Sequence, residues 1–238
     1  MRLDKFLCQM NLGTRSQIKT YIRQGYVSVN GQIEKSAERH VDEYIDRVSF
    51  RGHELHYTSV RYYMLNKPMG VVSATQDNTA GTVVELLSAR DRNGVFPVGR
   101  LDKDTEGLLI LTNDGELAHR LLTPKRHVDK TYLVSLEHSL SREDVLRLEQ
   151  GVDIGEAHPT LPAKVDMVDE KTIYLTIHEG KFHQIKRMLR AVNNGVTALK
   201  RISFAGLYLD GSLKPGEYRE LTDQEVAALH DAGDTKDA

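Results

Sequence analysis

The sequence lacks several features that would place a protein in a class at once. Only one of its 238 residues is a cysteine, Cys8, so an internal disulfide is excluded. It has no His and Cys cluster with zinc spacing, and no run of about 18 consecutive apolar residues. Lys and Arg (32) nearly balance Asp and Glu (34), which gives a formal net charge of −2. We therefore expect a cytoplasmic protein without a metal, a small-molecule cofactor or a membrane segment. Any RNA-binding surface must come from local clustering of basic residues.

Residues 1–58 have the pattern of a small α/β unit. Apolar residues recur at helical spacing over Leu3–Met10, and Thr14 with Gln17 fits a capping box that opens a second helix. Alternating residues then lead to Asn30–Gly31, which is a type I′ hairpin signal. We predict two helices followed by short strands.

Basic residues are concentrated in the two predicted helices of this unit. Helix faces rich in Lys and Arg can straddle RNA phosphates, although a solvated helix face would show the same charge. The candidate RNA-binding residues here are Arg2, Lys5, Arg15, Lys19 and Arg23.

The order of motifs in this unit is more specific than its charge. The runs Arg2–Leu7, Gly13–Ser16 and Ile22–Gly31 resemble the S4 RNA-binding module. The usual pattern has Ser-Arg after the glycine, whereas this chain has Thr14-Arg15-Ser16. The resemblance implies two helices packed on a small sheet, with the basic helix faces on structured RNA.

Residues 59–238 alternate many predicted strands with a few helices. This pattern favours a large mixed sheet, so we expect the α+β class. An acidic loop, Gly99–Gly107, lies between the apolar runs Val95–Val98 and Leu108–Thr112. The second run fits either a buried strand or a short helix. A Gly-bounded loop of this kind can present a carboxylate at the rim of a core, but a solvated loop has the same spacing.

A second charged stretch spans Glu179–Arg190. We expect Gly180 to open a helix with Phe182 on its apolar side and basic residues on the other side. Further candidate RNA-binding residues in residues 59–238 are Lys67, Lys125, Arg126, Lys130, Lys181 and Arg187.

Together, these stretches resemble the pseudouridine synthases, and within them the branch that carries an N-terminal S4 module and modifies ribosomal RNA. The match covers Arg2 to about Leu221, with Gly-Arg-Leu-Asp as its most specific part. The segments that carry it are Lys67–Gly70, Gly99–Gly107, Lys130–Tyr132 and Glu179–Met188. Two further runs, Thr123–Tyr132 and Leu213–Arg219, resemble the members that act on small-subunit RNA. The family implies a core built on a large, mostly antiparallel sheet with flanking helices.

The resemblance implies that Asp102 is the catalytic carboxylate. It would act as a nucleophile at C1′ of the ribose or as the base that removes a C2′ proton, and the sequence leaves both routes open. Lys186 matches the basic residue that keeps this acid charged, and Arg187 is the neighbour most easily mistaken for it. Asp104 and Glu106 are interpreted as acids that shape the loop.

The resemblance assigns further roles to Tyr132 and Arg100. Tyr132 is implied to stack on the target base and to assist proton removal at C5, which a phenol can do. Arg100 is implied to help extrude the nucleotide. His183 and Gln184 are interpreted as supporting or helix-capping residues.

The resulting hypothesis is the isomerisation of one uridine of small-subunit ribosomal RNA, by base flipping and an aspartate-dependent rearrangement of the glycosidic bond. We expect a monomer whose substrate is RNA in an assembling particle. Two alternatives stay open: a synthase for large-subunit RNA, and a non-catalytic assembly factor that binds ribosomal RNA.

Overall fold

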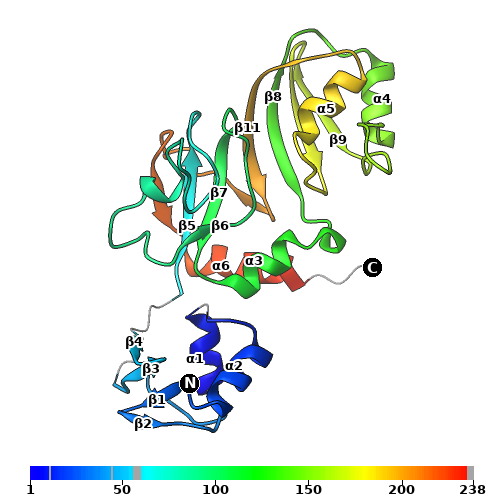
Figure 1. Ribbon diagram of the computed structural model, residues 1–238. Coiled ribbons are helices and arrows are strands. Elements are labelled where there is room, and N and C mark those ends of the chain that lie inside the picture. Colours follow the sequence, from blue (N-terminus) through cyan, green and yellow to red (C-terminus); the bar gives the residue numbers. More distant parts are fainter. Residues whose placement is uncertain (11, 44, 56–59, 235–238) are drawn as a thin grey trace. The chain divides into compact units, whose positions relative to one another are not determined.

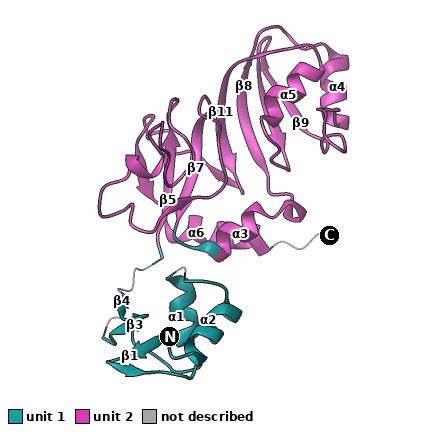
Figure 2. Cartoon of the chain, in the orientation of Figure 1, with its two compact units in different colours: residues 1–60, 113–115 teal, residues 61–112, 116–238 magenta. Residues whose placement is uncertain are grey.

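The computed structural model describes residues 1–10, 12–43, 45–55 and 60–234, and it divides the chain into two compact units. Unit 1 comprises Met1–Val60 and Asn113–Gly115, and unit 2 comprises Arg61–Thr112 and Glu116–Ala238 (Figure 2). The predicted boundary between residues 58 and 59 lies outside the described residues.

Unit 1 packs two helices on a small antiparallel sheet with the strand order β2-β1-β3-β4. The predicted capping box is present, because the Thr14 and Gln17 side chains bond reciprocally to each other's backbone N–H at the start of the second helix. Asn30 and Gly31 both have positive φ at the tight turn between the first two strands. The elements are α1 (Leu3–Gln9), α2 (Arg15–Arg23), β1 (Val27–Val29), β2 (Gln32–Ile33), β3 (Val48–Phe50) and β4 (His53–Leu55).

Unit 2 is built on one large sheet with helices on its faces (Figure 1). Its strands are β5 (Tyr62–Lys67), β6 (Phe96–Pro97), β7 (Glu106–Thr112), β8 (Lys130–Leu136), β9 (Lys164–Asp169), β10 (Thr172–Ile177), β11 (Val196–Phe204), β12 (Leu207–Tyr208) and β13 (Tyr218–Glu220). Its helices are α3 (Gly115–Leu122), α4 (Arg142–Gln150), α5 (Gln184–Ala191) and α6 (Asp223–Asp234), with the 3₁₀ turns η1 (Val84–Leu86) and η2 (Pro124–Arg126).

The strand order β13-β5-β7-β11-β8-β10-β9 brings together segments far apart in the sequence. Every neighbouring pair is antiparallel except β7 and β11, which run parallel. The predicted α+β class, with a mixed and mostly antiparallel sheet, is confirmed. The parallel junction lies where the acidic loop leads into β7, and the last two residues of the predicted loop, Glu106 and Gly107, already belong to this strand.

Both faces of the sheet are covered, and β7 shows this most clearly. Leu109 and Leu111 belong to one buried cluster, together with residues of α4 and α5, while Leu108 and Ile110 belong to the other, together with residues of α3 and α6. Alternation between two buried faces is the signature of a central strand. Leu108–Thr112 is therefore a strand, which decides between the two alternatives that its sequence allowed.

The helix expected to open at Gly180 begins later. α5 starts at Gln184, because His183 adopts a left-handed conformation with φ of 48° and cannot continue a helix on its N-terminal side. Phe182 is 74% exposed, so its predicted place on the apolar side of the helix is wrong. Among the described residues, no helix combines the length and the apolar character needed to cross a membrane.

Candidate active site

The acidic loop before β7 is fixed to the core by its own backbone. The Ser73 hydroxyl donates to the Leu101 carbonyl (2.9 Å) and accepts from the Leu101 N–H (3.0 Å). At the other end of the loop, Gly107 has φ of +103°, and a Cβ there would lie 2.2 Å from the Arg201 carbonyl oxygen. Only glycine allows β7 to approach β11 this closely. The loop therefore leaves the core at a defined position, with Asp102 at its tip.

Lys67 supports the same loop from inside, which corrects its predicted role in RNA binding. Its side chain is 0% exposed, so it cannot contact RNA. The ammonium donates to the backbone carbonyls of Pro68 (3.0 Å), Asp102 (3.0 Å) and Thr105 (2.8 Å). Burial lowers the pKa of Lys67 to about 8, although the neighbouring carboxylates oppose this shift. Lys67 positions the loop that carries Asp102.

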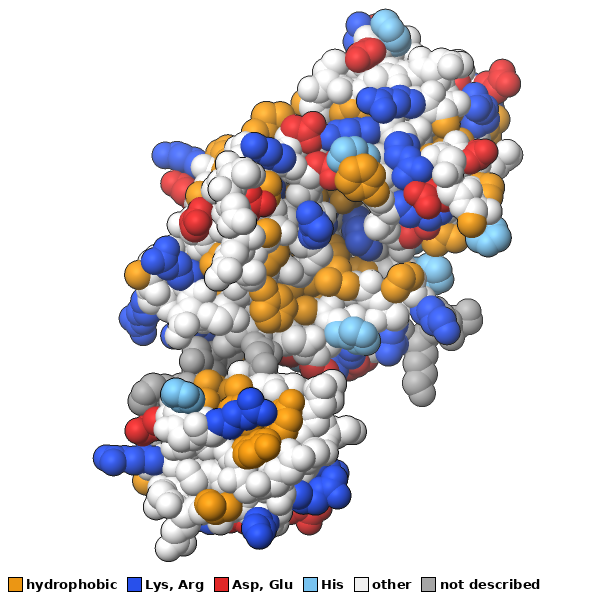
Figure 3. Space-filling model, viewed as in Figure 1, with side chains coloured by type: hydrophobic (Ala, Val, Ile, Leu, Met, Phe, Trp, Pro, Cys, Tyr) orange, Lys and Arg blue, Asp and Glu red, His pale blue; other side chains and the backbone are white. Residues whose placement is uncertain are grey.

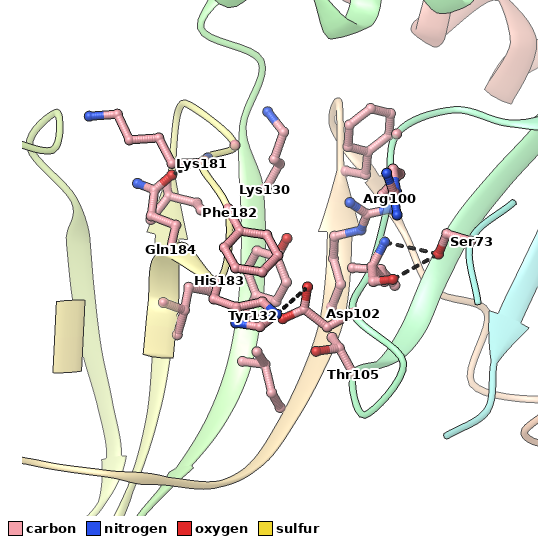
Figure 4. A pocket seen from close by; sticks show the side chains of 18 of the residues that line it. Ser73, Arg100, Asp102, Thr105, Lys130, Tyr132, Lys181, Phe182, His183 and Gln184 are labelled. Carbon is pink, nitrogen blue, oxygen red and sulfur yellow. Dashed lines mark hydrogen bonds and ion pairs between the residues drawn. The ribbon is translucent and has the colours of Figure 1, made fainter. Parts of the chain in front are cut away.

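A cavity of about 1030 Å³ opens beside this loop in unit 2. This volume is at the upper limit of the roughly 300–1,000 Å³ usual for small-molecule pockets. Figure 3 shows the hollow on this face of unit 2, with basic side chains at and inside its rim. Asp102 and Tyr132 both line it, and Tyr132 is 7% exposed. In Figure 4 the Asp102 carboxylate points toward Tyr132 and His183 across the cavity.

An ammonium group holds the Asp102 carboxylate from the opposite wall. Lys186 Nζ lies 3.2 Å from Asp102 Oδ2 and 2.6 Å from Asp104 Oδ1. Burial by itself would lower the pKa of Lys186, but its hydrogen bonds to the two carboxylates outweigh burial and raise it. The hydrogen bond from Lys186 likewise lowers the pKa of Asp104. The two acids and the lysine form one charged cluster, and 28% of the Asp102 side chain is accessible.

His183 adds a second nitrogen to this cluster. Its Nε2 lies 3.7 Å from Asp102 Oδ1, and its ring stacks on Phe182 with centroids 3.8 Å apart. His183 occupies the N-cap position of α5 but makes no capping hydrogen bond with its side chain. The left-handed backbone at His183 thus turns the ring toward Asp102 instead of along the helix.

Two other basic residues of this stretch, Lys181 and Arg187, are held by contacts within the protein, whereas Arg190 is exposed. Arg187 turns away from Asp102 and donates to the Ile154 carbonyl and to Glu156 Oε1 (2.7 Å). Lys181 contacts Glu179 (3.3 Å) and the Pro159 carbonyl, and Gln184 donates to the same Glu179. Lys181 and Gln184 line the cavity, whereas Arg187 does not.

Arg100, which was predicted to help extrude the nucleotide, and the remaining predicted RNA-binding residues lie in three places. Arg100 is exposed and lines the cavity, and Lys130 lines it from β8. Lys125 and Arg126 lie in η2, which immediately precedes β8 along the chain. In unit 1, Arg2 pairs with Asp4 (2.8 Å) just before α1. The basic residues of α1 and α2 that are exposed are Lys5, Arg15, Lys19 and Arg23.

Two features of the site were missed from the sequence. One is the contact between Asp104 and Lys186, which is the shorter of the lysine's two ion pairs. The other is Arg201, which is 2% exposed and lines the cavity from β11. An arginine within an alternating apolar strand was the only signal for it. Within the described residues, no group of three or more His, Cys, Asp or Glu side chains is placed to hold a metal ion.

The arrangement can hold an ionised carboxylate against a large, partly apolar cavity with an aromatic ring on its wall. Such a carboxylate can act as a nucleophile or as a base toward a group bound in the cavity. The ammonium of Lys186 lies 3.2 Å from this carboxylate and offsets part of the negative charge of the site.

Comparisons with known proteins place this geometry in a family. Residues 61–191 match the model of the RNA pseudouridylate synthase family, and residues 1–43 match the S4 domain. An uncharacterised RNA pseudouridine synthase of Bacillus subtilis, YtzG, is 48% identical over 236 residues, which cover 97% of this chain and 99% of that protein.

Two further relatives are a synthase for ribosomal small-subunit RNA and a pseudouridylate synthase of known structure. The ribosomal small subunit pseudouridine synthase A of Escherichia coli K12 is 39% identical, over 96% of this chain and 100% of that protein. A crystal structure of a pseudouridylate synthase superposes with a TM-score of 0.72 at 39% identity, covering 96% of this chain and 99% of that one.

Proposed function

Because the chain belongs to the RNA pseudouridylate synthase family, we propose that it converts one uridine of small-subunit ribosomal RNA into pseudouridine. The family makes it an RNA pseudouridine synthase, which is an isomerase. The small-subunit substrate is supported by the ribosomal small subunit pseudouridine synthases A of Vibrio cholerae and Escherichia coli, each 39% identical to this chain.

The contact between Asp102 and Lys186 at the cavity is the observation that carries the mechanism. The reaction breaks the N1–C1′ bond, rotates the base and joins C5 to C1′. C5 loses a proton and N1 gains one, so the isomerisation is balanced within one nucleotide without an oxidant or an energy source. It needs an anionic group beside the sugar, and Asp102 supplies a carboxylate that is paired with the Lys186 ammonium at 3.2 Å.

Asp102 acts on the ribose by one of two routes. As a nucleophile it attacks C1′ and releases uracil, which rotates and returns through C5. As a base it removes the C2′ proton, and the same departure of uracil leaves a glycal. Its 28% exposure leaves the carboxylate reachable from the cavity in either case.

Tyr132 acts on the target base, and Arg100 acts on the RNA from which this base is extruded. Tyr132 stacks on the extruded uracil, and its hydroxyl assists proton removal from C5. Arg100, exposed at the cavity, fills the position that the target nucleotide vacates. Extrusion costs a few kcal/mol of lost stacking, which contacts to the phosphates and within the cavity must offset.

The basic residues of unit 1 supply RNA affinity that does not depend on catalysis. Lys5, Arg15, Lys19 and Arg23 are exposed on its two helices, where they can neutralise phosphates. Each phosphate contact adds about 0.7–0.9 to the slope of log affinity against log salt. We expect the double variant Lys19→Ala/Arg23→Ala to bind RNA with a shallower salt slope and to keep its rate at saturating RNA. An unchanged slope would contradict this.

The substrate assignment is tested by mapping. Purified protein is incubated with small-subunit RNA, with large-subunit RNA and with the corresponding assembly intermediates. Pseudouridine is then located by carbodiimide treatment and primer extension. We expect one stop in small-subunit RNA. A stop only in large-subunit RNA would overturn the subunit assignment, and the absence of any stop would favour a non-catalytic assembly factor.

A further inference from the structure

The cavity contains two basic side chains that face each other without an acidic partner. Arg201 and Lys130 both line it, from the neighbouring antiparallel strands β11 and β8. Within the described part of the chain, no carboxylate lies at ion-pair distance from either group. Buried charges are normally paired, so this pair is an exception that calls for an explanation.

Arg201 is the more buried of the two. Its Nε donates to the Leu108 carbonyl (2.8 Å), whereas Nη2 is fully buried without a hydrogen-bond partner. The guanidinium lies 4.9 Å from the centroid of the Phe204 ring. These contacts fix the guanidinium against the cavity wall and leave donors unused.

Lys130 completes the pair from β8. Its ammonium lies 5.8 Å from the centroid of the same Phe204 ring and donates to the Val128 carbonyl. Burial lowers the pKa of Lys130 to about 8 and the charge of Arg201 adds to this, while Asp129 and Glu179 oppose it. An anion bound between the two groups would oppose this lowering of the Lys130 pKa.

The register of the strands relates this pair to the catalytic side chains. Arg201 lies directly opposite Tyr132, so the two side chains are on the same face of the sheet. Lys130 is two residues before Tyr132 on the same face, about 7 Å along the strand. In Figure 4, Lys130 lies away from the Asp102 carboxylate, while Tyr132 lies close to it.

We propose that Arg201 and Lys130 form a phosphate-binding site that holds a backbone phosphate bonded to the ribose of the target nucleotide. This inference rests on the proposed function and identifies the part of the substrate that the site takes. A ribose at Asp102 carries a phosphate on each side, so one of them necessarily lies near the sugar. A planar guanidinium and an ammonium match a phosphate, whereas uracil is neutral and needs no cation.

The size of the cavity agrees with this occupant. Its volume of about 1030 Å³ leaves space beyond that of a single nucleoside at Asp102. The site would position the ribose relative to the carboxylate, because the phosphate and C1′ belong to one sugar unit. Arg201 and Lys130 would then be substrate-positioning residues, and Asp102 would remain the reacting group.

The test uses RNA assembled from two annealed strands, with the break on one side of the mapped target uridine. In one substrate the target begins the second strand and carries either a 5′-phosphate or a 5′-hydroxyl. In the other it ends the first strand and carries either a 3′-phosphate or a 3′-hydroxyl. The measurement is kcat/KM for tritium release from C5 of the uridine.

With the wild-type protein, we expect removal of one of the two terminal phosphates to lower kcat/KM by about 10- to 100-fold, the range for a hydrogen-bonded charge. The Lys130→Met and Arg201→Gln variants should lose activity on the phosphorylated RNA and respond less than about threefold to removal of that phosphate. Lys130→Arg should restore most of the response. Lys164→Met, which removes an exposed lysine paired with Asp166 outside the cavity, should behave as wild type.

The inference is overturned if neither removal of the 5′-phosphate nor removal of the 3′-phosphate changes kcat/KM of the wild-type protein. It is also overturned if removal of the phosphate lowers kcat/KM of the variants by the same factor as that of the wild type. Circular dichroism checks that each variant is folded, and the wild-type comparison needs no variant at all. Failure of the wild-type protein to release tritium from intact RNA would contradict the proposed function instead, so the two failures are distinguishable.

Discussion

Removing the positive charge of Lys186 should slow the chemical step without abolishing RNA binding. Lys186 Nζ lies 3.2 Å from Asp102 Oδ2, and the two side chains are 19% and 28% exposed. With an effective dielectric constant of about 20, the Coulomb energy at this distance is about 5 kcal/mol. Solvent that reaches the pair reduces this to the range of a charged hydrogen bond, about 1.5–3 kcal/mol.

This energy converts into a rate because Lys186 holds the Asp102 carboxylate in the position from which it acts on the ribose. A loss of about 1.5–3 kcal/mol corresponds to a rate about 10- to 150-fold lower in Lys186→Met. The assay is tritium release under single-turnover conditions with saturating protein, so that differences in RNA affinity do not enter. Lys186→Arg keeps the charge and should retain most of the rate.

The matched control is Arg190→Gln, which removes the same charge one turn further along α5, at an exposed position outside the cavity. We expect this variant to release tritium at the wild-type rate. A wild-type rate in Lys186→Met, or an equal loss in Arg190→Gln, would refute the reasoning. The first result would show that Asp102 does not need Lys186 as its partner. The second would show that the loss of rate comes from the overall charge of the protein and not from this contact.

Three further predictions concern the framework of the protein. Lys67→Met leaves the buried carbonyls of the acidic loop without their donor, so we expect the free energy of unfolding, measured by urea titration, to fall by about 2–4 kcal/mol. We also expect kcat to fall by a larger factor than KM changes, and wild-type stability of this variant would contradict the prediction. Gly107→Ala places a Cβ against the Arg201 carbonyl at a residue with positive φ, so we expect the free energy of unfolding to fall by at least about 2–3 kcal/mol in the same titration. A variant as stable as the wild type would show that β7 and β11 can move apart without loss of stability. Arg219 holds Glu225 through two hydrogen bonds and lowers the pKa of Glu225 to about 2, below its value in the unfolded chain. The unfolded chain therefore binds more protons as the pH falls from about 4.5 to 2, and stability is lost over that window. Arg219→Gln should flatten the fall of Tm between pH 5 and 2, and an unchanged slope would contradict the role assigned to Arg219.

Local features of the fold were predictable because they depend on neighbouring residues. The capping box of Thr14 and Gln17 and the hairpin at Asn30–Gly31 follow from side-chain chemistry within a few positions. The position of Asp102 in a loop before a buried strand was readable for the same reason. The chemistry assigned to Asp102 came from the family motifs and not from this local pattern.

Long-range features were not predictable, because the parallel contact of β7 with β11 joins segments almost a hundred residues apart. This contact places Arg201 in the cavity, which no local pattern indicates. Lys67 was predicted to bind RNA, but its side chain is buried and its ammonium donates to backbone carbonyls of the acidic loop. The predicted start of α5 was too early because His183 has a left-handed backbone and ends the preceding segment. Its ring lies near Asp102, which is far away in the sequence, so the local pattern does not indicate this contact.

Two isosteric substitutions test the central claim most directly, because Asp102 and Asp104 share the ammonium of Lys186 but only Asp102 is assigned to the chemistry. The measurement is tritium release from RNA labelled at C5 of uridine, with purified Asp102→Asn and Asp104→Asn proteins of equal RNA affinity. The account predicts that Asp102→Asn loses at least about a thousandfold in rate, whereas Asp104→Asn loses no more than about tenfold. Turnover by Asp102→Asn at a rate comparable to that of Asp104→Asn would contradict it.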